Sequence, residues 1–201
     1  MAEQVDWRDR IRSSRLGSLF VVLVTTALII AGVLAVKGGG EEAAALSEIE
    51  LSEEASAVAP AVGEQAPIFS GLDIDGHTVD LETLDRPVWL IFNATWCSAC
   101  RAEVPHIQDA QEEHGDKVDI VAIYVNEGAE AVRSYVDQVG LTYTHMLDPT
   151  TEIAAAYRTM GVPAHYFINS DGTISSIHVG AVSPSQIEEA LAGLSASAGN
   201  R

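Results

Sequence analysis

The sequence predicts an α/β fold in which a central mixed β-sheet is flanked by helices, with an N-terminal transmembrane helix ahead of it. Apolar runs rich in β-branched residues, at 88–92 and 118–125, alternate with segments of helical periodicity, as in parallel strands joined by helices. A turn signal, Asp171-Gly172, adds an antiparallel pair near the C-terminus. The third observation is an apolar stretch at residues 17–36, long enough to cross a bilayer.

That apolar stretch predicts a single-pass protein of the cell membrane. Twenty residues at about 1.5 Å each span about 30 Å, the thickness of the hydrocarbon core. Arginines lie within residues 1–16 and glutamates follow from residue 41, so the positive-inside rule places the N-terminus in the cytoplasm and the folded domain outside it. A cleaved secretory signal is the alternative, although the stretch is longer than a typical signal core and no small-residue site closes it.

Composition limits the partners of the chain. The formal net charge is −18, and nearly all of the excess negative charge follows the apolar stretch. Such a surface repels phosphates, so nucleic acid is excluded as a partner. Residues 37–62 are dominated by Gly, Ala, Ser and Glu, which predicts an acidic flexible tether with room for a short helix near 41–54. The folded domain is expected over 63–195, with residues 196–201 frayed.

The first part of the folded domain is predicted to form a hairpin, a strand and a helix. Asp75-Gly76, between alternating apolar residues at 72–79, predicts a hairpin, and 81–84 a short helical turn. The apolar run at 88–92 is typical of a strand buried on both faces. A helix is expected over 101–114, with a kink where Pro105 interrupts it.

The middle of the domain continues the alternation. A strand is predicted at 118–125, an amphipathic helix at 129–139 ended by Gly140, and a strand at 143–147. An Asp-Pro pair at 148–149 predicts the next helix, with Asp as the cap and Pro at its first position. The apolar face of that helix comprises Ile153, Ala154 and Tyr157.

The C-terminal part predicts an antiparallel pair and a closing helix. The segment Gly161–Pro163 ends the preceding helix, and strands are expected at 164–168 and 173–179. Residues 183–186, Ser-Pro-Ser-Gln, form a capping box with Pro at the first helical position. The residues of this helix that should face the core are Ile187, Leu191 and Leu194.

The only two cysteines, Cys97 and Cys100, lie two residues apart and follow Trp96 at a strand-to-helix turn. Their Cα atoms would be roughly 5–6 Å apart on one helical turn, within the range that a disulfide requires. A purely structural bridge is a weaker interpretation, because closing so short a loop removes only about 2 kcal/mol of unfolded-state entropy. A zinc site would need four ligands, and no second cysteine pair exists. A redox-active dithiol, with no metal and no other cofactor, is therefore favoured.

Further motifs accompany the Trp-Cys-Ser-Ala-Cys segment. They are Glu103, Pro105, Gly161-Val162-Pro163, Ile168–Gly172 and Gly180. Together they resemble the membrane-tethered thioredoxin-like group that contains TlpA, ResA and CcmG, over about residues 63–194. The resemblance implies a thioredoxin-like fold and an outward-facing thiol-disulfide oxidoreductase. It also implies clients with disulfides, such as apocytochrome c or copper-site assembly proteins, and a membrane protein as electron donor.

Roles around the dithiol follow from helix geometry and from this resemblance. Cys97, at the helix start, is expected to be the exposed nucleophile, and Cys100 to be shielded and to resolve the mixed disulfide. Trp96 is expected either to shape the contact surface or to pack over the turn. The resemblance implies that Pro163 is cis, although most X–Pro bonds are trans, and that Val162 offers backbone groups to an extended substrate segment.

Glu103 is the expected general base. It lies three residues after Cys100 on the same helical face. A lone helix glutamate is most often solvated, but the resemblance implies a functional role. Ile91 stands where ordinary thioredoxins carry a buried aspartate, so accepting the proton of Cys100 is expected to fall to Glu103.

Two alternatives stay open beside a reductase. Ala99 stands where the group usually has Pro, and the residues between the cysteines help to set the reduction potential, so a disulfide-forming oxidase is one alternative. A copper-binding assembly factor resembling the Sco group is the other; that group uses CxxxC, and only His165 or His178 could serve as its distal ligand here. A peroxiredoxin is set aside because Leu90 occupies the proline position of its Pro-x-x-x-Thr-x-x-Cys motif.

Overall fold

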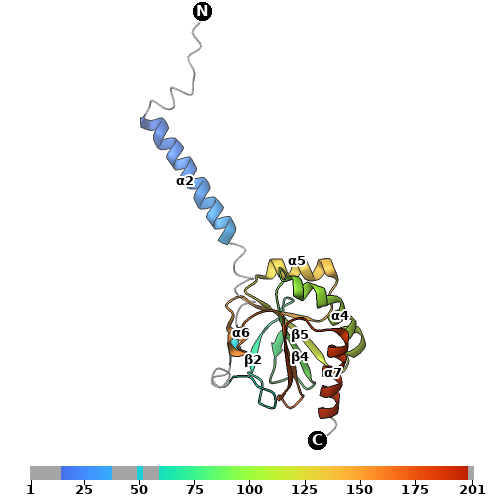
Figure 1. The fold of residues 1–201 in the computed structure, drawn as a ribbon. Coiled ribbons are helices and arrows are strands. Elements are labelled where there is room, and N and C mark those ends of the chain that lie inside the picture. The colour runs from blue at the N-terminus through green and yellow to red at the C-terminus, as the bar shows by residue number, and fades with distance from the viewer. Residues whose placement is uncertain (1–14, 38–48, 52–58, 199–201) are drawn as a thin grey trace, which may run out of the picture. The chain divides into compact units, whose positions relative to one another are not determined.

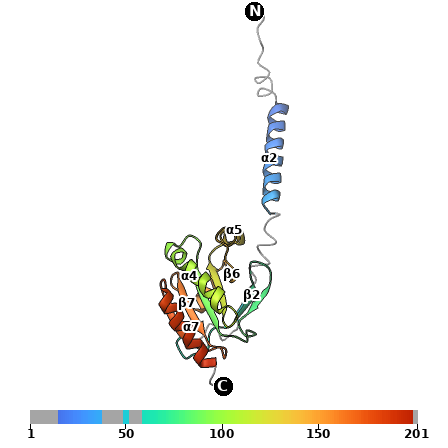
Figure 2. The same ribbon diagram turned by 90° about the vertical axis from the view of Figure 1, so that its right-hand side faces the viewer.

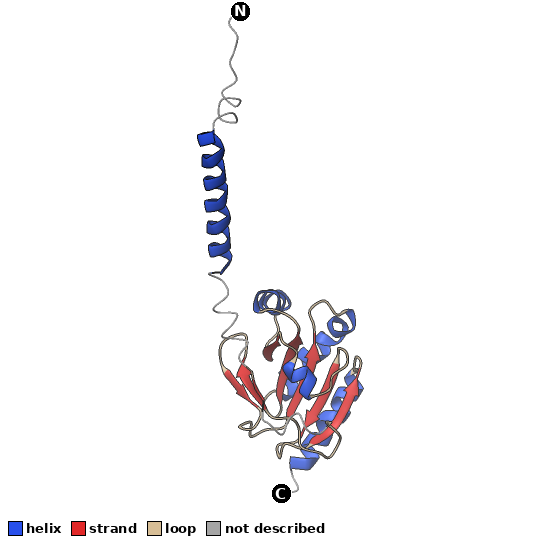
Figure 3. Cartoon of the chain, turned by 90° about the vertical axis from the view of Figure 1, so that its left-hand side faces the viewer, coloured by secondary structure: helices blue, strands red, loops and turns tan. Residues whose placement is uncertain are grey.

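A five-stranded mixed sheet forms the centre of residues 43–201, one of two compact units in the computed structural model. The structure describes residues 15–37, 49–51 and 59–198. The strands of this sheet lie in the order β6-β5-β4-β7-β8, and helices cover both of its faces (Figure 3). The predicted α/β class, with a central mixed sheet flanked by helices, is confirmed.

Parallel and antiparallel strands meet at the middle of the sheet (Figure 1). The strands β4 (Val88–Asn93), β5 (Asp119–Val125) and β6 (Thr144–Asp148) are parallel, whereas β7 (Ala164–Ile168) and β8 (Ile174–Val179) are antiparallel to their neighbours. All six residues of β4 are buried, as its unbroken apolar run predicts. Because β7 runs against β4, the residues that follow β4 lie at the same edge of the sheet as those that precede β7.

One face of the sheet is covered by three helices. These are α4 (Ser98–His114), α5 (Ala129–Val139) and α7 (Pro184–Ala198). Their inward side chains form one core cluster with Trp89 and Ile91 of β4. Figure 2 shows α4 and α7 on the same side of the sheet, away from β2. The helical residues of this cluster include Val104, Ile107, Val132, Val136, Ile187, Leu191 and Leu194.

The opposite face is covered by a short helix, α6 (Glu152–Ala156), and by a separate three-stranded sheet. That sheet consists of β1 (Glu50–Leu51), β2 (Phe69–Leu72) and β3 (Thr78–Asp80). The strands β2 and β3 form the predicted hairpin. Its turn contains Gly76 at φ = 85°, a left-handed conformation that glycine adopts without steric cost.

The strand β1 lies inside the segment that the sequence predicts to be a flexible tether. It pairs with β2, and Ile49 and Leu51 pack against the core cluster on this face. Two alternating apolar side chains suit a half-buried strand, which explains why an extended pair forms here instead of the expected helix. The predicted tether at 38–48 and 52–58 lies outside the described residues.

Three helix boundaries differ from the predictions, and the first is the start of α4, at Ser98 rather than at residue 101. The helix α6 begins later than expected, yet the Asp148 carboxylate still caps it by accepting hydrogen bonds from the backbone N–H groups of Ile153 and Ala154, at 3.3 and 2.8 Å. Intervening residues form a turn, because Asp148 is the last residue of a buried strand. At the C-terminus, α7 continues to Ala198, so residues 196–198 are helical rather than frayed.

The unit formed by residues 1–42 contains α2 (Arg15–Lys37), which includes the apolar stretch 17–36. Its described side chains, at 19–31, are exposed. Over the described ranges, no helix has both the length and the hydropathy of a membrane span. Most of the predicted cytoplasmic segment, residues 1–14, lies outside those ranges.

Candidate active site

A disulfide between Cys97 and Cys100 lies at the N-terminus of α4, just after β4. Cys97 is the N-cap residue of α4: its backbone is extended, and its Sγ accepts a hydrogen bond from the backbone N–H of Cys100 at 3.2 Å. The Cα atoms are 5.3 Å apart, as predicted. Because both this N–H and the helix dipole favour negative charge on the Cys97 sulfur, Cys97 is the better placed of the two to be a thiolate.

The accessibility of the two sulfurs differs from the expectation for Cys97. Cys97 is only 7% exposed and Cys100 only 3%, so the nucleophile is buried, although less deeply than its partner. Ala94 and Val162 pack against the pair and provide part of this cover. A client sulfur must therefore approach Cys97 along the surface of these neighbours.

The bond between Val162 and Pro163 is cis, which confirms the expectation. The carbonyl oxygen of Val162 lies 3.7 Å from the Sγ of Cys97, within reach of a reduced thiol. The backbone N–H of Gly180 donates to the carbonyl of Pro163 at 2.9 Å, which ties this loop to the end of β8. The chain thus brings Val162 and Pro163 next to the disulfide, as the sequence predicts.

Exposed apolar side chains lie at this edge of the sheet, two in loops and one at the end of β8. Trp96 is 68% exposed, Met160 98% and Val179 83%, and we name these three residues the apolar rim. Trp96 adjoins Cys97, Met160 lies two residues before Val162, and Val179 pairs with the residue after Pro163. Because Trp96 does not pack over the turn, its large apolar surface is available to a partner.

Glu103 is buried beneath α4, with 2% exposure, rather than solvated. Its Oε2 accepts a hydrogen bond from the backbone N–H of Val182 at 3.0 Å and lies 3.4 Å from Nε2 of His165, which is fully buried. His165 pairs on the neighbouring strand with Ile91, the residue that stands where ordinary thioredoxins carry a buried aspartate. The sequence predicts the importance of Glu103 but not its partner, since His165 lies on a distant strand.

The other polar groups beneath the helices are neutral near pH 7. His145 lies on β6, and its Nδ1 is 3.2 Å from the hydroxyl of Tyr124. Burial lowers the pKa of His145 to about 4, in spite of the nearby charge of Asp73. Burial also raises the pKa of the Tyr124 and Tyr143 hydroxyls above their usual value, so these groups provide hydrogen bonds and no charge.

A second carboxylate, which sequence reasoning missed, holds the loop before Cys97. The side chain of Glu127, after β5, accepts hydrogen bonds from the backbone N–H of Thr95 at 2.7 Å and from its hydroxyl at 2.5 Å. Thr95 immediately precedes Trp96, so these two bonds fix the segment that presents Trp96 and the nucleophile. No local pattern signals the contact, because the partners lie 32 residues apart.

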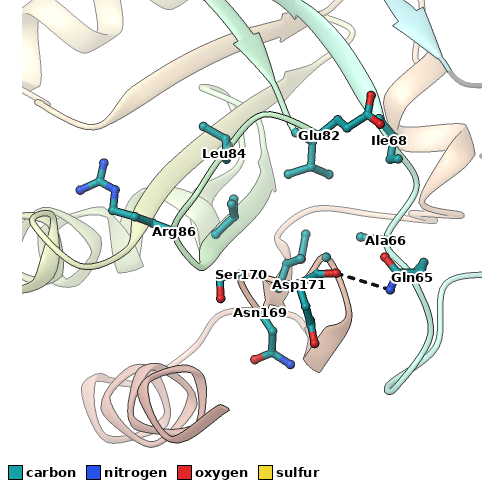
Figure 4. Close-up of a pocket in the computed structure, with 13 residues that line it drawn as sticks. Gln65, Ala66, Ile68, Glu82, Leu84, Arg86, Asn169, Ser170 and Asp171 are labelled. Atoms are coloured by element: carbon teal, nitrogen blue, oxygen red, sulfur yellow. Dashed lines mark hydrogen bonds between the residues drawn. The ribbon is translucent and has the colours of Figure 1, made fainter. Parts of the chain in front are cut away.

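A pocket of about 290 Å³ lies at the opposite end of the sheet (Figure 4). Its lining includes Val88, where β4 begins, and Ile168, where β7 ends. At its mouth the side-chain amide of Gln65 donates to the carbonyl of Asp171 at 3.5 Å. The disulfide follows the other end of β4, so this pocket is not part of the candidate active site.

Two groups of described side chains could each offer three ligand atoms to a cation. They are Asp73, Asp75 and His77, and Glu113, His114 and Glu188. In the first group, Asp73 already accepts hydrogen bonds from the backbone N–H groups of the β2–β3 turn. Neither group contains a cysteine, so neither supplies the ligand set that the copper alternative requires.

Comparison with known sequences agrees with this geometry. The AhpC/TSA family matches residues 62–177. The chain is 34% identical over 133 residues to the thioredoxin-like protein YneN of Bacillus subtilis, covering 64% of this chain and 78% of the relative. It is 32% identical over 129 residues to the thiol-disulfide oxidoreductase ResA of Halalkalibacterium halodurans, covering 63% of this chain and 73% of the relative.

Comparison with solved structures also finds thiol-disulfide interchange proteins. A thiol:disulfide interchange protein of the thioredoxin family from Chlorobium tepidum matches with a TM-score of 0.60 and 29% identity, covering 67% of this chain and 97% of that chain. A candidate thiol:disulfide interchange protein DsbE from the same organism matches with a TM-score of 0.62 and 25% identity, covering 68% of this chain and 99% of that chain.

Proposed function

Since the chain belongs to the AhpC/TSA family and is a thiol-disulfide oxidoreductase of the ResA and CcmG type, we propose that it is an extracytoplasmic, membrane-tethered reductase of protein disulfides. The observation that carries this proposal is the position of Cys97. As the N-cap of α4 beside the Val162 backbone, its sulfur has both a stabilised charge and a place for a substrate chain.

The proposed reaction runs through a mixed disulfide. The Cys97 thiolate attacks one sulfur of a client disulfide, which breaks the client S–S bond and releases one client thiolate. The Cys100 thiolate then attacks the Sγ of Cys97 and releases the second client thiolate, while the pair becomes the disulfide seen in the structure. Two electrons pass from the protein dithiol to the client, and each client thiolate takes up one proton.

Glu103 is the proposed base for the second attack. Cys100 is buried and lies one turn inside the helix, so its thiol ionises less readily than that of Cys97. A buried carboxylate one turn further along the same face can accept this proton. The hydrogen bond from the backbone N–H of Val182 and the close approach of His165 Nε2 fix the position of the Glu103 carboxylate in the core.

The proposed clients are proteins that present a disulfide on an extended, apolar segment. The apolar rim provides contact surface for such a segment, and the backbone of Val162 provides hydrogen-bonding groups next to Cys97. Apocytochrome c and copper-site assembly proteins are the client classes that the family resemblance suggests. A membrane electron-donor protein would return the disulfide to the dithiol.

Membrane attachment rests on residues 17–36, whose apolar length suits a bilayer, with arginines before and glutamates after. Mass spectrometry of the protein purified from its own membranes should detect peptides from residues 8–15. A mature N-terminus beyond residue 36 would instead support the cleaved signal and contradict the anchor.

The reduction potential of the Cys97–Cys100 couple separates the reductase from its alternatives. Equilibration of the protein with dithiothreitol buffers should give a value near about −270 mV, as in thioredoxin, whereas about −120 mV, as in DsbA, would support the oxidase. Ala99→Pro, measured beside it, reports how far this position shifts the potential. Equilibrium dialysis with Cu(I) tests the copper alternative, which predicts binding that is lost in His165→Ala.

A further inference from the structure

The described partners of Glu103 both lie at one of its two carboxylate oxygens. The backbone N–H of Val182 and Nε2 of His165 approach Oε2, at 3.0 and 3.4 Å. Oε1 is also buried, and no group in the described ranges forms a hydrogen bond with it. A buried carboxylate oxygen without a donor is uncommon in folded proteins and requires an explanation.

The position of Cys100 provides that explanation. It precedes Glu103 by three residues, so the two side chains share one face of α4. Helical side chains lean towards the N-terminus, which carries the Glu103 carboxylate towards the turn that holds Cys100. Both residues are buried, so no bulk water competes for the proton. Oε1 is thus the acceptor available to the Cys100 thiol.

His165 is held rigidly where it meets Glu103. It lies on β7 opposite Ile91, is fully buried, and has its ring centre 5.9 Å from that of Trp89. Its ring nitrogens make no hydrogen bond of good geometry within the described ranges, and Glu103 is the acidic side chain within ion-pair distance there. The imidazole is therefore directed at one oxygen of one carboxylate.

We infer that His165 is a positioning residue for thiol-disulfide exchange: its Nε2 holds Oε2 of Glu103 and thereby aims Oε1 at Cys100. This inference rests on the proposed role of Glu103 as the base. The N–H of Val182 is the second point that fixes Oε2.

The step that this arrangement serves is the release of the client. The proton moves from Sγ of Cys100 to Oε1 of Glu103, and the Cys100 thiolate attacks Sγ of Cys97. The bond between Cys97 and the client sulfur breaks, and its electron pair leaves on the client thiolate, which takes up a proton. The dithiol is oxidised to the disulfide, and the client disulfide is reduced.

Other titratable groups lie near Glu103 and His165, and one of them provides a control substitution. Tyr143, in the segment before β6, has a raised pKa, chiefly through burial and in smaller part through the charge of Glu103. His178, on β8, pairs directly with His165 across the strands and is only partly buried. Cys100 lies one turn before Glu103 on α4 and is also buried. His178 is therefore the matched histidine for a control substitution.

Reaction of the reduced full-length protein with Ellman's reagent separates the two attacks. The first thionitrobenzoate is released when Cys97 attacks the reagent, and the second when Cys100 attacks the resulting mixed disulfide. We compare His165→Leu, His165→Gln, Glu103→Gln and His178→Leu from pH 5 to pH 9 by stopped flow. His165→Leu removes the N–H donor, whereas His165→Gln retains one.

At pH 7, His165→Leu should slow the second phase about tenfold and leave the first unchanged, and Glu103→Gln should slow the second phase about a hundredfold. The defect of His165→Leu should shrink as the pH rises towards about 9, because hydroxide then competes with Glu103 for the Cys100 proton. His165→Gln should recover the wild-type rate to within about threefold, and His178→Leu should match the wild type. Should His165→Leu not fold, His165→Asn, whose shorter amide does not reach Oε2, replaces it.

The contrary outcomes are distinct. If Glu103→Gln retains the wild-type second phase, the proposed base is wrong. If Glu103→Gln is slow while His165→Leu matches the wild type, only the inference about His165 fails. A second phase that is slowed equally at every pH, and is not restored by His165→Gln, would show that His165 acts through packing alone and would also overturn the inference.

Discussion

Removing the Glu127 carboxylate should loosen the loop that presents the nucleophile. Glu127→Ala deletes both hydrogen bonds to Thr95, one from the backbone N–H at 2.7 Å and one from the hydroxyl at 2.5 Å. Hydrogen bonds to a charged group contribute about 1.5–3 kcal/mol each, so the pair is worth at most about 6 kcal/mol. Both residues are partly exposed, and solvent takes the place of the lost acceptor, which reduces the expected loss to about 2 kcal/mol.

Urea denaturation at pH 7, on the reduced and the oxidised protein, measures this loss. Glu130→Ala is the matched control, because Glu130 is an exposed acidic residue close by in the chain. The rate of the Cys97 phase with Ellman's reagent should also fall severalfold in Glu127→Ala, since Cys97 lies two residues after Thr95. Thr95→Val removes the hydroxyl bond alone and should show about half the loss.

Equal stability and equal Cys97 reactivity in Glu127→Ala and Glu130→Ala would refute this reasoning. The contact would then be a surface hydrogen bond without influence on the active-site loop.

Three further predictions concern the site and its surroundings. Cys100→Ser should accumulate client adducts through Cys97, whereas Cys97→Ser should accumulate none; non-reducing electrophoresis with mass spectrometry identifies the adducts, and the reverse pattern would reverse the assignment. Trp96→Ala with Met160→Ser should lower kcat/KM for a protein disulfide several-fold but leave the reaction with Ellman's reagent unchanged. Because burial lowers the pKa of His145 to about 4, the folded protein should lose about 3 kcal/mol of stability as the pH falls from about 6.5 to 4; His145→Gln should lack this loss in acid-titrated urea curves.

The parts of the fold that local sequence determines were predictable. The buried strand at Val88–Asn93 follows from an unbroken apolar run, and α5 from apolar residues at helical spacing ended by Gly140. The disulfide was predictable for the same reason, because Cys97 and Cys100 lie one turn apart when the helix begins at this segment. In each case the interacting residues are neighbours in the chain.

The parts that were not predictable depend on contacts between distant segments. His165 meets Glu103 only because β7 pairs with β4 beneath α4, and Glu127 reaches Thr95 only because β5 lies beside β4. The strand β1 forms because β2 offers it an edge, and its two alternating apolar residues stand within a segment whose overall composition is typical of a tether. The burial of Cys97 likewise depends on the loop that contains Val162.

The redox state of the Cys97–Cys100 pair in living cells tests the central claim most directly. Acid quenching followed by alkylation with a maleimide-linked polymer separates dithiol from disulfide on a gel, with Cys97→Ser as the marker for a single free thiol. A reductase that a membrane electron donor keeps reduced should be found mainly as the dithiol at steady state. A protein found almost wholly as the disulfide in untreated cells would contradict the account and support an oxidase.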